Sequence, residues 1–427
     1  MSEFDVIVVG AGQAGLGIGY LLQQSETRFT ILERGEIGES WRSQRWESFA
    51  VNTPNWMNGL PGSPYDGIAP DGFHLRDQLV ASFERHAERH SLPIRRGVTV
   101  ERVEASEGSP GFEVHSVDAQ GRQRVLLTRS VVVATGLMQS PKIPAIAGTF
   151  PSSVVQLHAS EYRAPGLLPD GAVIVVGSGQ SGCQIADDLA TSGRAVYLCT
   201  SKVARVPRRY RGRDALEWMT DLGKWAETVS DLPDPRMEFA AQPQVSGVGR
   251  LGKTLSLQAL QQQDIRLMGR LQSVSDGRVH TDDGLAAHIA FADAFSADFK
   301  RTIDTHIDSH SLDYPAADVD PADAPAGPEV PAAGMMALDL EEADVGTVIW
   351  CTGFTTSFDW LRAPVIDEHG RPIHRRGVSP VPGIYFLGFP WLHTRKSGII
   401  YGIEEDARHV EEAIAAHLSR PWVAPAL

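Results

Sequence analysis

The chain has 427 residues, 42 % of them apolar and 22 % charged, which excludes wholesale disorder and suggests two or three domains. Its net charge of −14 argues against nucleic acid as the main partner, no apolar run is long enough to span a membrane, and the first residues lack the features of a secretory signal. The three cysteines form no C-x-x-C pair, so neither a disulfide scaffold nor a redox dithiol is indicated. We therefore expect a cytoplasmic protein that works away from membranes.

The first predicted element is a strand–turn–helix unit that binds a nucleotide. A β-branched strand over residues 4–9 leads into Gly-Ala-Gly-Gln-Ala-Gly at 10–15 and then a helix, and a second strand ends at Glu33. Gly12 has no Cβ, so a pyrophosphate can approach the backbone, while Gly15 lets helix and strand pack closely. The helix N-terminus offers N–H groups to the phosphates. Glu33 would accept hydrogen bonds from a ribose, which predicts a nucleotide with a free 2′-OH, such as FAD.

A helix and several strands are predicted next. Apolar residues at helical spacing predict a helix near 75–90, and short apolar runs predict strands over 98–103, 112–117 and 125–127. Two buried strands that end in turns, at 131–136 and 348–353, are interpreted as the places where the chain crosses between domains.

The nucleotide-binding pattern recurs in the second half of the chain. A strand over 172–176 leads into Gly-Ser-Gly-Gln-Ser-Gly at 177–182, and a helix and another strand follow. Eighteen residues after the third glycine, where the first unit has its acid, the second unit has Thr200. Lys202 and Arg205 follow, and such residues bind a 2′-phosphate that a carboxylate would repel. The second unit therefore favours NADPH over NADH, with Lys202 or Arg205 as the phosphate contact.

Two such units predict two cofactors that face each other, with hydride transfer from nicotinamide to flavin. The predicted fold class is α/β, with two Rossmann-like dinucleotide-binding domains. A discontinuous FAD-binding domain takes residues 1–160 and 350–427, and an NADPH-binding domain takes 161–349. The second domain carries an insertion at about 230–345, in which apolar residues spaced four apart from Phe291 predict a helix that packs against the core or lines a substrate pocket.

The order of these motifs resembles that of class B flavoprotein monooxygenases: the first glycine motif with Glu33, an Ala-Thr-Gly turn at 134–136, His158 and the second glycine motif. That class includes the flavin-containing, N-hydroxylating, YUCCA-type and Baeyer–Villiger enzymes, and the chain is most similar to bacterial single-chain FAD- and NAD(P)-dependent oxidoreductases. The resemblance covers the chain except for about 230–345. It implies FAD and NADPH as cofactors, O2 and a small organic molecule as substrates, and oxygen transfer through a C4a-(hydro)peroxyflavin.

The family motif F-x-G-x-x-x-H-x-x-x-W is only partly present. His158 and Tyr162 have the right mutual spacing, but Phe150 lies eight residues before the histidine instead of six, and Val154 replaces the glycine. The resemblance therefore favours oxygenation of nitrogen or sulfur over Baeyer–Villiger chemistry. His158 either positions the domains or contacts NADPH.

Asn52 resembles an asparagine that flavin-containing monooxygenases hold close to the flavin edge. An amide there can hydrogen-bond the oxygenated flavin and slow the loss of H2O2, and the alternative is an ordinary residue of an Asn-Thr-Pro turn.

The motifs and the resemblance together name the candidate site residues, and no metal site is expected because no metal-binding spacing is present. The catalytic candidates are Asn52 and His158. The cofactor-binding candidates are Gly10, Gly12, Gln13, Ala14, Gly15, Glu33, Arg34, Ser40, Trp41, Arg42, Thr53, Val100, Ala134, Thr135, Gly136, Gly177, Ser178, Gly179, Gln180, Ser181, Gly182, Thr200, Ser201, Lys202, Arg205, Cys351, Thr352, Gly353 and Gly388.

Other functions stay open. An NAD(P)H oxidase or dehydrogenase would keep both cofactors without oxygen transfer, a Baeyer–Villiger enzyme would oxygenate a carbonyl, and a flavin-bound sensor would be reduced slowly or not at all. The arginine-rich segment 205–213 is interpreted as a phosphate-binding or salt-bridged loop rather than a nucleic-acid site. The sequence leaves the oligomeric state open, a homo-oligomer included.

Overall fold

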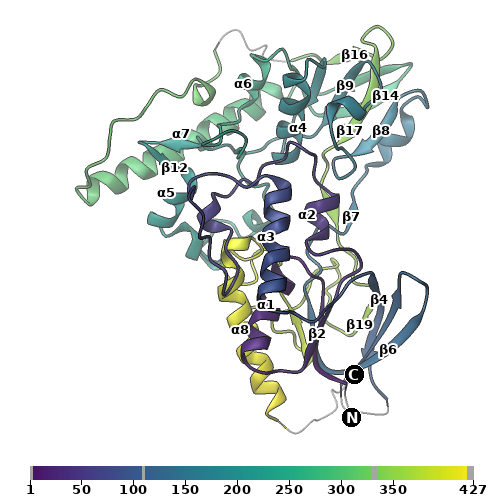
Figure 1. The fold of residues 1–427 in the computed structure, drawn as a ribbon. Coiled ribbons are helices and arrows are strands. Elements are labelled where there is room, and N and C mark those ends of the chain that lie inside the picture. Colours follow the sequence, from purple (N-terminus) through teal and green to yellow (C-terminus); the bar gives the residue numbers. More distant parts are fainter. Residues whose placement is uncertain (1–2, 108–110, 328–333, 421–427) are drawn as a thin grey trace.

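Two open α/β sheets form the frame of the computed structural model, which describes residues 3–107, 111–327 and 334–420 (Figure 1). The first sheet has the strand order β19-β4-β5-β6-β1-β2-β3, and β20 pairs with β6. Its strands are β1 (Phe4–Val9), β2 (Phe29–Leu32), β3 (Ile94–Arg95), β4 (Val98–Ala105), β5 (Phe112–Asp118), β6 (Gln123–Val133), β19 (Leu361–Arg362) and β20 (Ile384–Phe386).

The strand β6 is longer than the sequence pattern predicts. The predicted strand 125–127 and residues 131–133 of the predicted element at 131–136 belong to this one strand. Its first half pairs antiparallel with β5, and its second half runs parallel to β1 and β20. Val131, Val132 and Val133 are fully buried, as expected where a parallel sheet is covered on both faces. The change of partners along one strand is a tertiary feature that a local apolar pattern does not contain.

The second sheet is fully parallel, with the order β13-β10-β9-β17-β8. Its strands are β8 (Val155–His158), β9 (Ala172–Val176), β10 (Val196–Cys199), β13 (Arg266–Met268) and β17 (Val345–Trp350). A separate antiparallel sheet is formed by β14 (Leu271–Ser275), β15 (Arg278–Thr281) and β16 (Ala337–Asp339). The predicted α/β class with two Rossmann-like units is confirmed, because each main sheet has a parallel centre from which a glycine-rich turn leads into a helix.

The chain passes between the two main sheets twice. After β6 it runs through β7 (Ser140–Pro141) into β8, and after β17 it returns through β18 (Phe354–Thr355), which pairs antiparallel with β7. β8 pairs with β17 in the second sheet, although the expected FAD-binding domain extends to residue 160. We therefore propose that the first part of this domain ends before Val155.

The helices of the first unit include the one predicted near 75–90, which is α3 (Arg76–Arg89). The others are α1 (Gln13–Gln24), α2 (Glu39–Ser43) and α8 (Ile403–Leu418). α1 and α8 pack closely, since a Cβ on Gly17 would lie 2.5 Å from the Ile403 side chain. Among the described helices, none combines the length and the apolar content that crossing a membrane requires.

The insertion contains a long helix, α7 (Leu285–Ser309), which lies away from the first sheet in Figure 1. Ile303 and Ile307 are buried against Trp218, so the predicted packing of this helix against a core is confirmed for its second half. Phe291, near its start, contacts Lys202 instead. The second unit also contains α4 (Gln180–Thr191), α5 (Ala215–Asp221) and α6 (Leu257–Gln261). Residues 328–333 of the insertion lie outside the described part of the chain.

Asp406 on α8 is a buried carboxyl, 5 % exposed, and burial is the main reason that its pKa rises to about 6. A folded-state pKa above the unfolded value means that the folded state binds the proton more tightly, so ionisation of Asp406 costs stability as the pH rises through 6. We expect Asp406→Asn to raise the free energy of unfolding by roughly 2 kcal/mol at about pH 8 and by much less at about pH 4, because the penalty develops between the ordinary pKa of 3.8 and the folded-state pKa of about 6. Urea titrations at the two pH values measure this difference, and an equal gain at both would contradict it.

Candidate functional site

The turn between β1 and α1 has the shape that a pyrophosphate requires. Gly10 has a φ of 109°, and a Cβ placed on it would lie 2.5 Å from the carbonyl oxygen of Ala134. A Cβ on Gly15 would lie 1.8 Å from the Gly10 oxygen, so helix and strand approach closely. A Cβ on Gly12, by contrast, would meet no atom within 4 Å. Open space therefore lies directly before the N-terminus of α1, where backbone N–H groups lack helical partners.

Glu33 is fixed beside this turn. Its carboxylate accepts hydrogen bonds from the backbone N–H groups of Ala11 (2.7 Å) and Gly35 (2.9 Å), and its oxygens retain lone pairs for ribose hydroxyls. Gly388, after β20, approaches the same turn, since a Cβ on it would lie 2.6 Å from the Cβ of Ala14. The structure thus brings together three predicted features, namely the first glycine motif, Glu33 and Gly388.

The turn between β9 and α4 repeats this geometry closely. Gly177 has a φ of 105°, and a Cβ on it would lie 2.6 Å from the carbonyl oxygen of Cys351, which takes the place of Ala134 in the first unit. A Cβ on Gly182 would lie 1.7 Å from the Gly177 oxygen, and one on Gly179 would meet no atom within 4 Å. The residues of both turns therefore fit a dinucleotide pyrophosphate.

Two of the residues predicted to contact the 2′-phosphate are buried, and their side chains bind other protein groups instead. Thr200 is 1 % exposed, and its hydroxyl donates to the carbonyl oxygen of Met268 at 2.7 Å. Arg205 is also 1 % exposed, and its guanidinium pairs with the carboxylates of Asp293 and Asp323. The geometry therefore contradicts Thr200 and Arg205 as phosphate contacts, because neither side chain reaches the surface of the nucleotide site.

Ser201 and Lys202 remain as candidates at the end of β10. The backbone N–H of Ser201 donates to the hydroxyl of Ser178 at 2.9 Å, which ties this loop to the second glycine turn. Lys202 is exposed, and its Nζ lies 4.5 Å from the centre of the Phe291 ring. A solvated ammonium next to the turn is the free cation that a 2′-phosphate requires.

Asn52 lies at the contact between the two units. Its Oδ1 accepts a hydrogen bond from Nε2 of Gln184 on α4 at 2.7 Å, and its carbonyl oxygen accepts one from Nη1 of Arg208 at 2.8 Å. The same stretch binds α4 again where the Ser48 hydroxyl donates to Asp188 at 2.6 Å. With Oδ1 engaged, the Nδ2 of Asn52 has no partner among the described residues and is available as a donor.

Gln184 and Arg208 contact Asn52 and are candidate site residues that sequence reasoning missed. Gln184 and Asp188 lie four residues apart on one face of α4, so a search for polar residues at helical spacing could have found the face that contacts the first unit. Arg208 is buried, pairs with Asp214 at 2.6 Å and lies 4.4 Å from the Phe73 ring. No local pattern distinguishes it from the arginines beside it.

His158 is fully buried at the end of β8, and both of its ring nitrogens have protein partners. Nδ1 lies 2.8 Å from the Ser160 hydroxyl, and Nε2 lies 2.9 Å from the carbonyl oxygen of Gly353. Burial lowers the pKa of His158, so the ring is neutral near pH 7. These contacts support a histidine that positions the crossing between the units rather than one that contacts NADPH.

The remaining predicted residues lie on several elements, some of which contact the two turns. Trp41 Nε1 donates to Oε1 of Gln13 at 2.9 Å, which ties α2 to the first turn, and Arg42 pairs with Glu84 near the surface. Gln180 begins α4 and donates to the carbonyl oxygen of Pro243. The others are Ser181 in α4, Arg34 after β2, Ser40 in α2, Thr53 after Asn52, Val100 in β4, Thr135 and Gly136 after β6, and Thr352 after β17.

Cys351 lies beside the residue before Cys183, since a Cβ on Gly182 would lie 3.4 Å from the Cβ of Cys351. The pKa of Cys351 is raised mainly by burial and, to a smaller extent, by its proximity to Cys183. Burial also raises the pKa of Cys183 to about 12. Thiols with raised pKa values stay protonated at neutral pH and are poor nucleophiles, so these cysteines give no support to a dithiol reductase.

The arginine-rich segment 205–213 is salt-bridged, as one sequence interpretation proposed. Arg205, Arg208, Arg211 and Arg213 each pair with at least one carboxylate. These pairs neutralise the charges that a nucleic-acid site would need to present.

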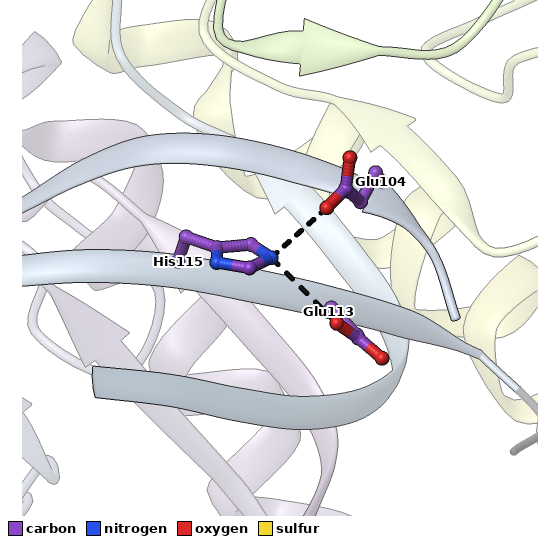
Figure 2. Close-up of side chains that lie close together, drawn as sticks. All are labelled: Glu104, Glu113 and His115. Carbon is purple, nitrogen blue, oxygen red and sulfur yellow. Dashed lines mark ion pairs between the residues drawn. The ribbon is translucent and has the colours of Figure 1, made fainter. Parts of the chain in front are cut away.

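One group of side chains in the described part of the chain has the composition of a metal site. Glu104, Glu113 and His115 lie on the neighbouring strands β4 and β5, with Nε2 of His115 3.0 Å from Glu104 and 3.6 Å from Glu113 (Figure 2). Arg102 already pairs with Glu104 at 3.1 Å. We interpret the group as polar contacts on a partly exposed sheet surface, in which the pair Glu104–His115 joins the two strands.

Two matching glycine turns, each at the parallel centre of its own sheet, define a protein with two dinucleotide-binding units. The family model of pyridine nucleotide-disulphide oxidoreductases matches residues 7–216. A CzcO-like oxidoreductase of Geobacillus kaustophilus is 30 % identical over 416 residues, which cover 97 % of this chain and 99 % of that protein. The chain belongs to the family of CzcO-like oxidoreductases.

Two solved structures share the fold of this chain. A flavin-containing monooxygenase from Stenotrophomonas maltophilia has 20 % identity and a TM-score of 0.63, covering 98 % of this chain and all of that one. The structure of OTEMO in complex with FAD and NADP has 16 % identity and a TM-score of 0.54, covering 97 % of this chain and 86 % of that one.

Proposed function

We propose that this protein is an FAD- and NADPH-dependent monooxygenase that transfers one atom of O2 to a nitrogen or sulfur atom of a small organic substrate. The observation behind the proposal is that Gly12 and Gly179 both leave open space in two similar turns, while Glu33 lies beside the first and the loop of Lys202 lies beside the second. A carboxylate suits a free ribose, and a lysine suits a 2′-phosphate. FAD and NADP are also the two dinucleotides of the OTEMO complex.

Each unit has a distinct role in this proposal. The turn at 10–15 and the N-terminus of α1 would hold the FAD pyrophosphate, and Glu33 would hold its ribose. The turn at 177–182 and the N-terminus of α4 would hold the NADPH pyrophosphate. A bound flavin supplies hydride acceptance and oxygen activation, which no side chain provides. The protein binds both nucleotides, orients them and excludes water.

Asn52 would donate a hydrogen bond within the reaction site, because Gln184 engages its Oδ1 and leaves Nδ2 free. We expect Asn52→Ala to raise the share of NADPH oxidation that ends as H2O2 by about tenfold, since one positioned donor is lost. Parallel assays of NADPH consumption and H2O2 release measure this share.

The variant Gln184→Leu provides a matched control for this prediction. It keeps the Asn52 amide and removes the hydrogen bond that orients it, so a smaller rise in H2O2 is expected. Equal H2O2 shares in Asn52→Ala and the wild type would contradict a role for the amide.

The proposed function is tested by supplying NADPH and isotopically labelled O2 with a panel of amines, sulfides and ketones. Label in an N-oxide or S-oxide supports the proposal, and label in an ester would establish Baeyer–Villiger chemistry instead. Stoichiometric H2O2 with every substrate would favour the NAD(P)H oxidase alternative.

A further inference from the structure

Helix α7 of the insertion contacts the loop that follows β10, where the proposed 2′-phosphate contact lies. Three contacts run in parallel along the helix and the loop. They join Thr200 to His288 (3.0 Å between Oγ1 and Nδ1), Lys202 to Phe291 (4.5 Å from Nζ to the ring centre) and Arg205 to Asp293 (2.6 Å). The loop is therefore bound along its length by an element outside the Rossmann-like sheet.

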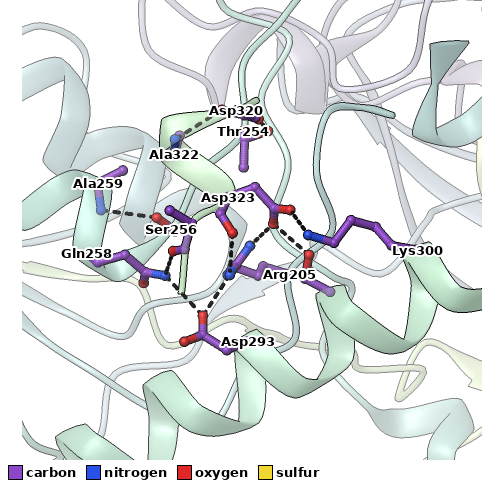
Figure 3. Close-up of polar contacts among 12 residues, drawn as sticks. Arg205, Thr254, Ser256, Gln258, Ala259, Asp293, Lys300, Asp320, Ala322 and Asp323 are labelled. Carbon is purple, nitrogen blue, oxygen red and sulfur yellow. Dashed lines mark hydrogen bonds and ion pairs between the residues drawn. The ribbon is translucent and has the colours of Figure 1, made fainter. Parts of the chain in front are cut away.

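Arg205 fixes this loop to the insertion through a buried ionic network. Its guanidinium binds Asp293 and Asp323, and Lys300 of α7 binds Asp323 at 2.5 Å (Figure 3). Ser296 of α7 also donates to Asp323 at 2.6 Å. Two cations and two carboxylates thus neutralise one another, and removing Asp323, which both cations contact, leaves an excess positive charge beside the buried Arg205. This cost opposes displacement of the loop.

Phe291 acts on the exposed end of the same loop. A lysine at a surface loop samples many rotamers, and the face of an aromatic ring attracts its ammonium and restricts it. Lys202 is thus held on a loop that is itself held by Arg205.

We propose that the insertion sets the preference of the second unit for a 2′-phosphorylated nucleotide. Phe291 and Asp293 of α7 and Asp323 of the segment Pro321–Asp323 are the positioning residues, and Lys202 is the phosphate contact. This inference rests on the assignment of NADPH to the second unit in the proposed function. It gives the insertion a role in nucleotide selection.

The test is calorimetric titration of the FAD-loaded full-length protein with adenosine 2′,5′-bisphosphate and, separately, with adenosine 5′-phosphate. The wild type should bind the bisphosphate more tightly, and Lys202→Ala should remove this preference. Asp323→Asn should weaken bisphosphate binding by about tenfold, and Phe291→Leu by about threefold. Binding of the monophosphate should stay within about twofold in all three variants, because it lacks the group that Lys202 contacts.

Asp298→Asn is the matched control, since it removes an exposed ion pair with Arg301 on the same helix, and it should change neither affinity. Equal weakening of both probes would show a merely structural role and overturn the inference. An unchanged preference in Phe291→Leu would also overturn it, even if Asp323→Asn failed to fold. An unchanged preference in Phe291→Leu would leave the proposed function standing. A wild type that binds both probes equally would contradict both the inference and NADPH as the reductant.

Discussion

Gly12→Val is expected to leave the fold intact and to abolish FAD binding. The Gly12 backbone is extended (φ −81°, ψ −170°), which valine adopts readily, and an added Cβ would meet no atom within 4 Å. The new side chain would fill the space through which a pyrophosphate approaches α1, so we expect at least about a hundredfold loss of affinity. Flavin absorbance after gel filtration, together with circular dichroism, measures both effects.

Gly10→Val is the control for Gly12→Val, because a side chain at residue 10 would clash with the protein itself and not with a bound ligand. Gly10 has a φ of 109°, and its Cβ would lie 2.5 Å from the Ala134 oxygen, so this variant should lose its fold rather than its flavin alone. A Gly12→Val protein that kept stoichiometric flavin would rule out the first turn as the FAD site.

Gly179→Val is expected to keep FAD and to lose reduction by NADPH. The backbone is again extended (φ −72°, ψ −171°), and an added Cβ would meet no atom within 4 Å. The blocked turn belongs to the second sheet, so flavin content should match the wild type while the rate of flavin reduction falls by about a hundredfold or more at a fixed NADPH concentration. Anaerobic stopped-flow spectroscopy measures this rate.

Reduction by dithionite, which needs no nucleotide site, is the control for Gly179→Val and should be unchanged. A variant that NADPH reduced at the wild-type rate would contradict the assignment of the second turn. Loss of flavin from this variant would show that the two turns do not act on separate nucleotides.

The parts of the fold that the sequence predicts are those whose geometry is local. Gly10 allows a tight turn, Gly12 leaves space for a ligand, and Gly15 allows the helix to pack closely on the strand. The same spacing from Gly177 onward gives the same structure. Glu33 lies one strand further on and still contacts the turn, because adjacent parallel strands end at the same edge of the sheet.

The parts that the sequence does not predict depend on distant partners. Arg205 is a residue type that binds phosphate, and it follows β10 as a phosphate contact should. Its partners Asp293 and Asp323, however, lie 88 and 118 residues later, in the insertion. The role of Asn52 at the contact between the units likewise depends on Gln184, which belongs to the other unit. Local spacing carries no information about which charges meet when the units pack.

The most direct test of the account is anaerobic mixing of the FAD-loaded protein with one equivalent of NADPH or of NADH, followed by flavin absorbance. The account predicts complete reduction of the flavin by NADPH, and slower reduction at equal concentration by NADH, since a nucleotide in the second turn must pass its hydride to the flavin in the first. A flavin that stays oxidised with both nucleotides would contradict the account.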